Sequence, residues 1–103
     1  MSTQEAYRRE LAELLGALAG NVRRLRGEKK PECSQEEVAM EANLHRTQWG
    51  MIEQGKRDPR FSTMLVVAET LGVTLDELAA GIDAPKERKP SPPTTKRKPT
   101  PRA

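Results

Sequence analysis

The chain has one cysteine, three aromatic residues and no long apolar run, and each shortage excludes a class of protein. A single cysteine, Cys33, allows neither an internal disulfide nor a cage of thiolate metal ligands. So few aromatic and β-branched residues do not favour a sheet sandwich. No apolar run reaches the roughly 18 residues that cross a bilayer, and the N-terminal residues lack a signal-peptide stretch. We therefore expect a soluble, cytoplasmic protein.

Large apolar residues are confined to the first 82 positions. Every Leu, Ile, Val and Phe precedes Asp83, so only residues 1–82 can build a core. Residues 83–103 contain six prolines and seven Lys or Arg, which predicts a disordered basic tail. The net charge of +3 comes from this tail, because residues 1–82 hold 13 acidic and 11 basic side chains. Net charge alone therefore does not indicate a nucleic-acid partner.

Capping patterns place three helix starts in the first 82 residues. Ser34 and Thr74 are each followed three residues later by a glutamate, Glu37 and Glu77, which is the capping box. A third start, at His45, repeats the layout with a glutamine in the acidic place, but histidine is a weak cap compared with serine or threonine. These patterns predict helices that begin just after 34, 45 and 74.

Apolar periodicity predicts further helices. Apolar residues between positions 11 and 25 recur at spacings of three and four, which indicates an amphipathic helix that ends near Gly27. Residues 3–15 either extend this helix or form a separate one packed against it. Another apolar face lies between positions 64 and 71 and ends at Gly72. Together the patterns predict an all-α domain of five or six helices.

The stretch from Ala39 to Leu44 predicts a helix-turn-helix. Asn43 tolerates positive φ better than most non-glycine residues, so a helix can end there. Leu44 would then turn inward, and Ala39 is small enough for a second helix to cross closely.

The segment from Leu18 to Ile82 resembles the Cro and lambda-repressor type of helix-turn-helix protein, the XRE family. The resemblance rests on SQEEVA at 34–39, IEQGKRDP at 52–59 and LGVTLDEL at 71–78. It implies a lambda-repressor-like five-helix domain over residues 17–82, with an N-terminal helical extension at 1–16 and the basic tail at 83–103. The function it implies is sequence-specific binding of double-stranded DNA by a transcriptional regulator.

In that family the third helix, here about Arg46 to Gln54, lies in the major groove. The resemblance implies base contacts from the start of this helix and one turn later, by Arg46, Thr47, Gly50 and Met51. Arg46 is the strongest candidate, because its guanidinium fork matches guanine O6 and N7. The contacts that the resemblance implies with the DNA backbone come from Gln35, Gln48, Lys56, Arg57 and Arg60.

Other residues of the same stretch are interpreted as structural. Trp49 takes the place of an aliphatic core residue, and Glu53 takes the place of an acid that stabilises the turn. Gly50 costs about 1 kcal/mol in a helix interior and leaves one base-reading position without a side chain. The Lys and Arg residues between positions 23 and 30 fit two interpretations, an approach to the DNA backbone or cations at a helix C-terminus.

We expect a homodimer on a palindromic operator, with two third helices about 34 Å apart. Leu75 to Ile82 is the expected dimer surface, to which Tyr7 to Leu15 can add. An enzyme is not expected, because one His, one Cys and no glycine-rich phosphate loop suggest no catalytic pair, metal or cofactor. The alternative is a protein-interaction module on the same fold, an antitoxin or an adaptor of the transcription machinery. The expected location is the bacterial nucleoid, with no membrane partner.

Overall fold

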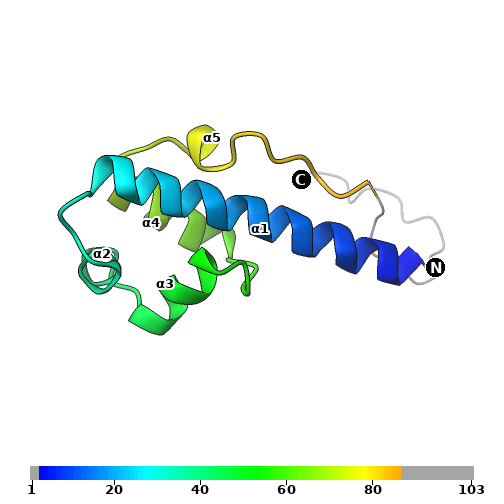
Figure 1. Cartoon of the computed structure of the whole chain (residues 1–103), viewed down its shortest axis with the longest axis horizontal. Helices are drawn as coiled ribbons and strands as arrows, with labels where there is room; N and C mark the ends of the chain where they lie inside the picture. Colours follow the sequence, from blue (N-terminus) through cyan, green and yellow to red (C-terminus); the bar gives the residue numbers. More distant parts are fainter. Residues whose placement is uncertain (1–2, 87–103) are drawn as a thin grey trace, which may run out of the picture.

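The computed structural model describes residues 3–86, which form five α-helices and no strand (Figure 1). The helices are α1 (Thr3–Lys29), α2 (Gln35–Glu41), α3 (Arg46–Glu53), α4 (Phe61–Leu71) and α5 (Leu75–Leu78). The predicted all-α, five-helix architecture is confirmed. Most of the predicted basic tail, residues 87–103, lies outside the described residues.

Helix α1 is continuous across the point that the sequence left open. Its 27 residues form one rod of about 40 Å at 1.5 Å per residue. The helix passes the expected end at Gly27 and stops at Lys29, because Pro31 is the first residue that disfavours helical backbone before it. Its N-terminal half projects beyond the other helices (Figure 1). None of the helices in residues 3–86 combines the length and apolarity needed to span a membrane.

The two predicted capping boxes are both present. The Ser34 backbone N–H donates to Glu37 Oε1 at 2.8 Å, and the Glu37 N–H donates to Ser34 Oγ at 3.1 Å. Hydrogen bonds to its carboxylate from the backbone and the side chain of Ser34 hold the pKa of Glu37 below its ordinary value. Thr74 and Glu77 form the same reciprocal pair at the start of α5. Local sequence therefore sets where α2 and α5 begin.

Three helices end with the same local structure. A residue with positive φ follows each of them, namely Asn43 at 58°, Gly55 at 72° and Gly72 at 70°. Its N–H donates to the carbonyl three residues back, and the next N–H donates to the carbonyl five residues back. This pair of bonds is the Schellman motif, which needs a residue that tolerates left-handed backbone. The turn predicted at Asn43 is confirmed.

The core lies between α1 and the other four helices. Trp49 at its centre has no exposed surface, as the sequence predicted for a core residue. The buried cluster is Leu18, Val22, Leu25, Val38, Ala39, Ala42, Trp49, Ile52, Val67, Ala68, Leu71 and Leu78. Burying one large apolar side chain contributes about 1.5–3 kcal/mol, so this cluster is the main source of stability.

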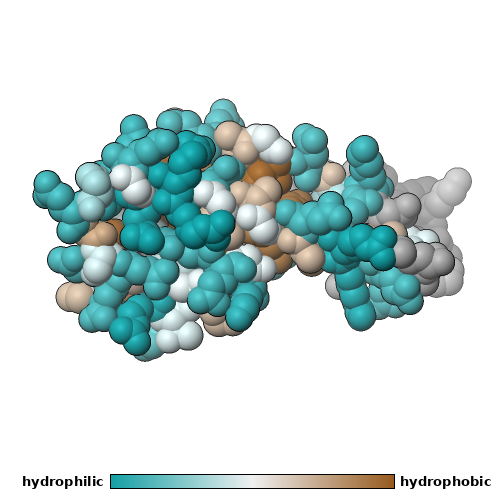
Figure 2. Space-filling model, viewed as in Figure 1, coloured by the Kyte–Doolittle hydropathy of each residue, from teal (hydrophilic) through white to brown (hydrophobic). Residues whose placement is uncertain are grey.

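The chain after α5 is held against α1. Asn21 Nδ2 on α1 donates to the carbonyl oxygens of Leu78 and Ala80, each at 2.9 Å. Further along, the backbone N–H of Lys86 donates to the carboxylate of Glu10. In Figure 1 this segment runs alongside α1, and the same view in Figure 2 shows one apolar area near the middle of a face that is otherwise mostly hydrophilic.

Candidate nucleic-acid interface

Helix α3 has an inward and an outward side. The inward side carries three buried residues, Trp49, Ile52 and Glu53. The outward side carries Arg46 and Thr47, which are exposed, and Met51, which is half-buried. Because α3 packs against both α1 and α2, its orientation is fixed from the inside, and its outer side chains face away from the core.

Glu53 joins three helices. It is 3% exposed and is the one buried polar or charged residue in the described part of the chain. Its Oε2 accepts from Arg26 Nε and from Trp49 Nε1, both at 2.6 Å. Its Oε1 accepts from Arg26 Nη2 at 3.1 Å and from Gln35 Nε2 at 3.0 Å. This carboxylate therefore connects α1, through Arg26, and α2, through Gln35, to α3.

The surroundings of Glu53 keep it ionised. Burial raises its pKa, but the hydrogen bonds from Arg26, Trp49 and Gln35 outweigh burial and leave the pKa below its ordinary value of 4.5. At neutral pH the carboxylate is thus a buried anion paired with Arg26. Removing one member of such a buried pair costs about 3–5 kcal/mol. The geometry agrees with the structural role that the sequence indicated for Glu53.

Gln35, a predicted backbone contact, lies over Gly50, a predicted base contact. The Gln35 amide nitrogen is bonded to Glu53, and its Oε1 would be 3.5 Å from a Cβ placed on Gly50. Gly50 is buried. Gly50 is therefore not on the exposed side of α3 with the other predicted base contacts. The carboxamide of Gln35 occupies the space above it.

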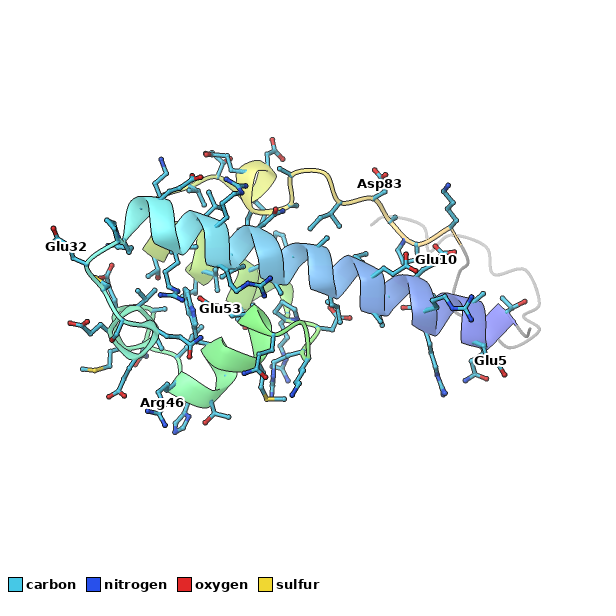
Figure 3. The ribbon with its side chains drawn as sticks, viewed as in Figure 1. Glu5, Glu10, Glu32, Arg46, Glu53 and Asp83 are labelled. Atoms are coloured by element: carbon cyan, nitrogen blue, oxygen red, sulfur yellow. The ribbon has the colours of Figure 1, made fainter. Side chains whose placement is uncertain are left out.

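Arg46 points away from the body of the protein at the outer end of α3 (Figure 3). Its side chain is 66% exposed, and its Nη1 donates to Glu36 Oε2 on α2 at 3.1 Å. An exposed pair of this kind contributes only about 0.2–1 kcal/mol, so the guanidinium can exchange Glu36 for another acceptor. The residue before it, His45, caps α3 through Nδ1, which accepts from the Thr47 N–H at 3.1 Å. The His45 side chain therefore caps α3, although histidine is a weak cap compared with serine or threonine.

The other predicted backbone contacts lie at the far end of α3 and in the loop to α4. Gln48, Arg57 and Arg60 line one polar hollow, whose other lining residues are the acidic Asp58 together with Pro59, Ser62 and Thr63. Lys56, Arg57 and Arg60 are exposed. Within residues 3–86 none of these three cations forms an ion pair. The structure thus places unpaired positive charge beside one end of α3, while Gln35 lies on α2.

The cations at the end of α1 are mostly engaged within the protein. Arg23 donates to the backbone carbonyl of Glu53, at the C-terminus of α3. The ion pairs of this region are Arg24–Glu28, Arg26–Glu53 and Lys30–Glu41. Four of the five cations between positions 23 and 30 therefore make contacts within the protein, and the approach of this region to the DNA backbone stays an untested prediction. No group of three or more His, Cys, Asp or Glu in residues 3–86 is arranged to hold a metal ion.

Comparison with known proteins identifies the family. The profile of a family described as "Helix-turn-helix domain" matches residues 20–84. The control protein C.MunI of Mycoplasma sp is 34% identical over 64 residues, which are 62% of this chain and 86% of that protein. The crystal structure of the restriction-modification controller protein C.AhdI from Aeromonas hydrophila is 30% identical, with a TM-score of 0.60 over 65% of this chain and 94% of that one. The chain therefore belongs to the helix-turn-helix domain family, as a DNA-binding transcription regulator of the XRE type.

Proposed function

We propose that this protein recognises its operator by inserting the outward side of α3 into the major groove of DNA. The observation that carries the proposal is the division of α3: Trp49 and Glu53 fix it from the inside, and Arg46 is 66% exposed at its outer end. Two relatives bear the names of control proteins, one of them a restriction-modification controller. We extend that role to this chain, which would regulate the genes of such a system from the bacterial nucleoid.

Base recognition is assigned to three exposed or half-exposed side chains of α3. Arg46 would release Glu36 and donate two hydrogen bonds to guanine O6 and N7, a pair worth about 1–3 kcal/mol of discrimination. Thr47 and Met51 would contact thymine methyl groups. Gly50 has no side chain to contact a base. The carboxamide of Gln35 lies over it and occupies that space.

Contacts with phosphates would flank α3 on both sides. Lys56, Arg57 and Arg60, with Gln48, would contact the backbone near the loop to α4. On the α2 side, Gln35 uses one amide hydrogen for Glu53 and retains a second one for a phosphate. Such contacts set the position of the protein on the duplex and carry no direct sequence information.

The operator is proposed to be an inverted repeat bound by a homodimer, because a two-fold symmetric protein reads symmetric half-sites about 34 Å apart. No cofactor is required for this function. The alternative that the sequence left open, an antitoxin or an adaptor of the transcription machinery, is not favoured, because the relatives are controllers of gene expression.

Selection of bound duplexes from a random pool tests the proposal. The expected product is an inverted repeat. Arg46→Ala should then lose about 10- to 100-fold of its preference for that repeat over scrambled DNA and keep its helical circular dichroism. Arg24→Ala is the matched control, since this exposed arginine pairs with Glu28 on α1 and lies outside the proposed interface. Equal behaviour of the two variants would reject the assignment of α3 as the reading helix.

A further inference from the structure

Gly50 leaves a gap in the middle of the outward side of α3. At about 100° per residue along a helix, position 50 points in a direction between those of Arg46 and Thr47, which are exposed. A side chain at position 50 would therefore face the same groove as these two residues. Apart from the backbone of α3 and the two neighbouring residues, the atoms within 4 Å of a Cβ placed on Gly50 belong to Gln35: Oε1 at 3.5 Å and Cδ at 4.0 Å. The gap is thus filled from α2.

Glu53 sets the orientation of the Gln35 carboxamide. An ionised carboxylate only accepts hydrogen bonds, and Glu53 Oε1 accepts from Gln35 Nε2 at 3.0 Å. The amide nitrogen therefore lies toward the buried Glu53, and the amide oxygen lies beside Gly50 on the outward side of α3. Turning the carboxamide over would place two oxygens against each other, so the amide oxygen is held in its outward position.

The amide oxygen of Gln35 is an acceptor that the protein does not use. Within residues 3–86 no donor is bonded to this oxygen, whereas every buried side-chain nitrogen or oxygen in the same part of the chain has a partner. Because Gln35 itself is half-buried, an oxygen without a partner must be accessible to solvent. An acceptor that is already oriented can bind a donor on a partner without the cost of ordering its side chain.

We propose that Gln35 reads a base through the gap at Gly50, with Oε1 accepting a hydrogen bond from the amino group of an adenine or a cytosine. This rests on the proposed function, which places the outward side of α3 in the major groove and gives the second amide hydrogen of Gln35 to a phosphate. Adenine N6 and cytosine N4 are the donors that bases present in this groove. Guanine O6 or thymine O4 would meet the amide oxygen with a second acceptor. Gln35 therefore determines specificity at one position of each half-site.

Two other residues support this role without contacting the base. Glu53 is a positioning residue, because its carboxylate holds the amide nitrogen of Gln35 inward. Gly50 leaves the space that the carboxamide occupies. Recognition at this position thus depends on a residue of α2 and on two residues of α3 that do not contact the base.

Single-group changes in the DNA test the proposal. In the selected operator, each adenine of a half-site is replaced in turn by purine, which lacks the amino group, and each cytosine by pyrimidin-2-one, which lacks it too. At one position the change should weaken binding by the wild type about 3- to 10-fold, the effect of one lost hydrogen bond. The same change should have no further effect on Gln35→Met, which keeps the length of the side chain and lacks the oxygen. The base at that position distinguishes adenine from cytosine.

Two further variants complete the test. Gln4→Met is the matched control, because Gln4 is exposed on the projecting half of α1, and it should respond to every base analogue as the wild type does. Gly50→Ala keeps the bond between Gln35 and Glu53 and places a methyl group 3.5 Å from the amide oxygen. It should reduce the effect of the same base analogue and keep its helical circular dichroism. Gly50→Ala carries the comparison alone if Gln35→Met does not fold.

The outcomes separate this proposal from the function on which it rests. If Gln35→Met weakens binding to the operator and to scrambled DNA by the same factor, Gln35 contacts phosphates only, and the proposal is overturned while recognition by α3 stands. Equal responses of the wild type and Gln35→Met to every base analogue overturn it in the same way. A wild type that prefers no duplex to scrambled DNA overturns the proposed function and this proposal together.

Discussion

Arg46 and Glu36 form an exposed ion pair that connects the start of α3 to the start of α2, with Arg46 Nη1 3.1 Å from Glu36 Oε2. The pair lies on the side of the protein that we propose faces DNA. Glu36 therefore has two opposite effects: it positions the guanidinium of Arg46, and it places a negative charge near the phosphates. Because both side chains are more than half exposed, the pair is easily broken.

Glu36→Gln is expected to tighten DNA binding. The substitution removes a negative charge next to the duplex and frees Arg46, and an exposed pair is worth about 0.2–1 kcal/mol, which corresponds to a gain of up to about fivefold. Fluorescence anisotropy with the selected operator measures the change. Glu28→Gln is the matched control, because Glu28 forms the corresponding exposed pair with Arg24 on α1. A loss of affinity in Glu36→Gln would contradict this expectation and would show that the positioning of Arg46 by the carboxylate outweighs its negative charge.

Lys56→Ala combined with Arg57→Ala should reduce the salt dependence of binding. Each phosphate contact contributes about −0.9 to the slope of log K against log salt concentration, so the slope should become shallower by about 1.8. Titrations at several salt concentrations give the slope. Arg24→Ala combined with Lys29→Ala removes the same number of charges from α1 and should leave the slope as it is. An unchanged slope in the first variant would place these residues away from the phosphates.

Glu53→Gln is expected to lower the free energy of unfolding by about 3–5 kcal/mol at neutral pH. The neutral side chain no longer balances the charge of Arg26, and its amide group cannot accept all the hydrogen bonds that the carboxylate accepts. Urea denaturation followed by circular dichroism measures the loss. Glu32→Gln, at an exposed position in the turn before α2, should be close to neutral.

The same variant should also change the response to acid. Because folding lowers the pKa of Glu53, its ionised form contributes stability above the ordinary value of 4.5, and this contribution is lost as the pH falls through the folded pKa. The difference in stability between the wild type and Glu53→Gln should therefore narrow below about pH 4.5. A difference that stays constant from pH 7 to pH 3 would contradict the pairing of Glu53.

Replacing Gly50 in α3 and Gly55 just after it with alanine should change the free energy of unfolding in opposite directions. Gly50→Ala should raise the free energy of unfolding by about 0.5–1 kcal/mol, because glycine is a poor helix former and the new Cβ makes an ordinary contact of 3.5 Å with Gln35. Gly55→Ala should lower it by about 1–3 kcal/mol, because φ is +72° and the Cβ would be 3.2 Å from the carbonyl oxygen of Leu15. Thermal unfolding compares the two, and the reverse order would contradict this account of the loop.

Local signals explain why much of the fold could be predicted from the sequence. The starts of α2 and α5 depend on side chains three residues apart, and the turn at Asn43 depends on the conformational preference of one residue. The end of α1 was less well predicted, because Gly27 weakens a helix without ending it when neighbouring turns are held by packing and by pairs such as Arg24–Glu28.

The cluster around Glu53 could be predicted only in part. The acid itself was interpreted as structural, but its partners lie 27 residues away, at Arg26, and 18 residues away, at Gln35. No local pattern links residues at such separations. The nearest local signal is the spacing of Trp49 and Glu53, which are four residues apart and therefore neighbours on one side of a helix. A buried indole N–H needs an acceptor, and Glu53 is in reach to provide it. The position of Gln35 over Gly50 follows from the same long-range cluster, and no local pattern predicts it.

The apolar face of α4 shows a different limit. The sequence correctly indicated the buried side, with Val67, Ala68 and Leu71. Phe61, Leu65 and Val66 extend the apolar surface of the helix beyond its buried side, and such a pattern does not distinguish a deeply buried helix from one that meets a partner. Only the three-dimensional arrangement shows that these three side chains are left uncovered.

The separation of the two sides of α3 has a consequence for how such a protein acquires a new target. Substitutions at Arg46, Thr47 and Met51 touch little of the interior, so under the function that we propose they change the preferred operator while the scaffold stays folded. Trp49, Ile52 and Glu53 would stay fixed in such variants, because each of them also holds a neighbouring helix. A library randomised at the three outer positions should therefore yield many well-folded members with altered specificity.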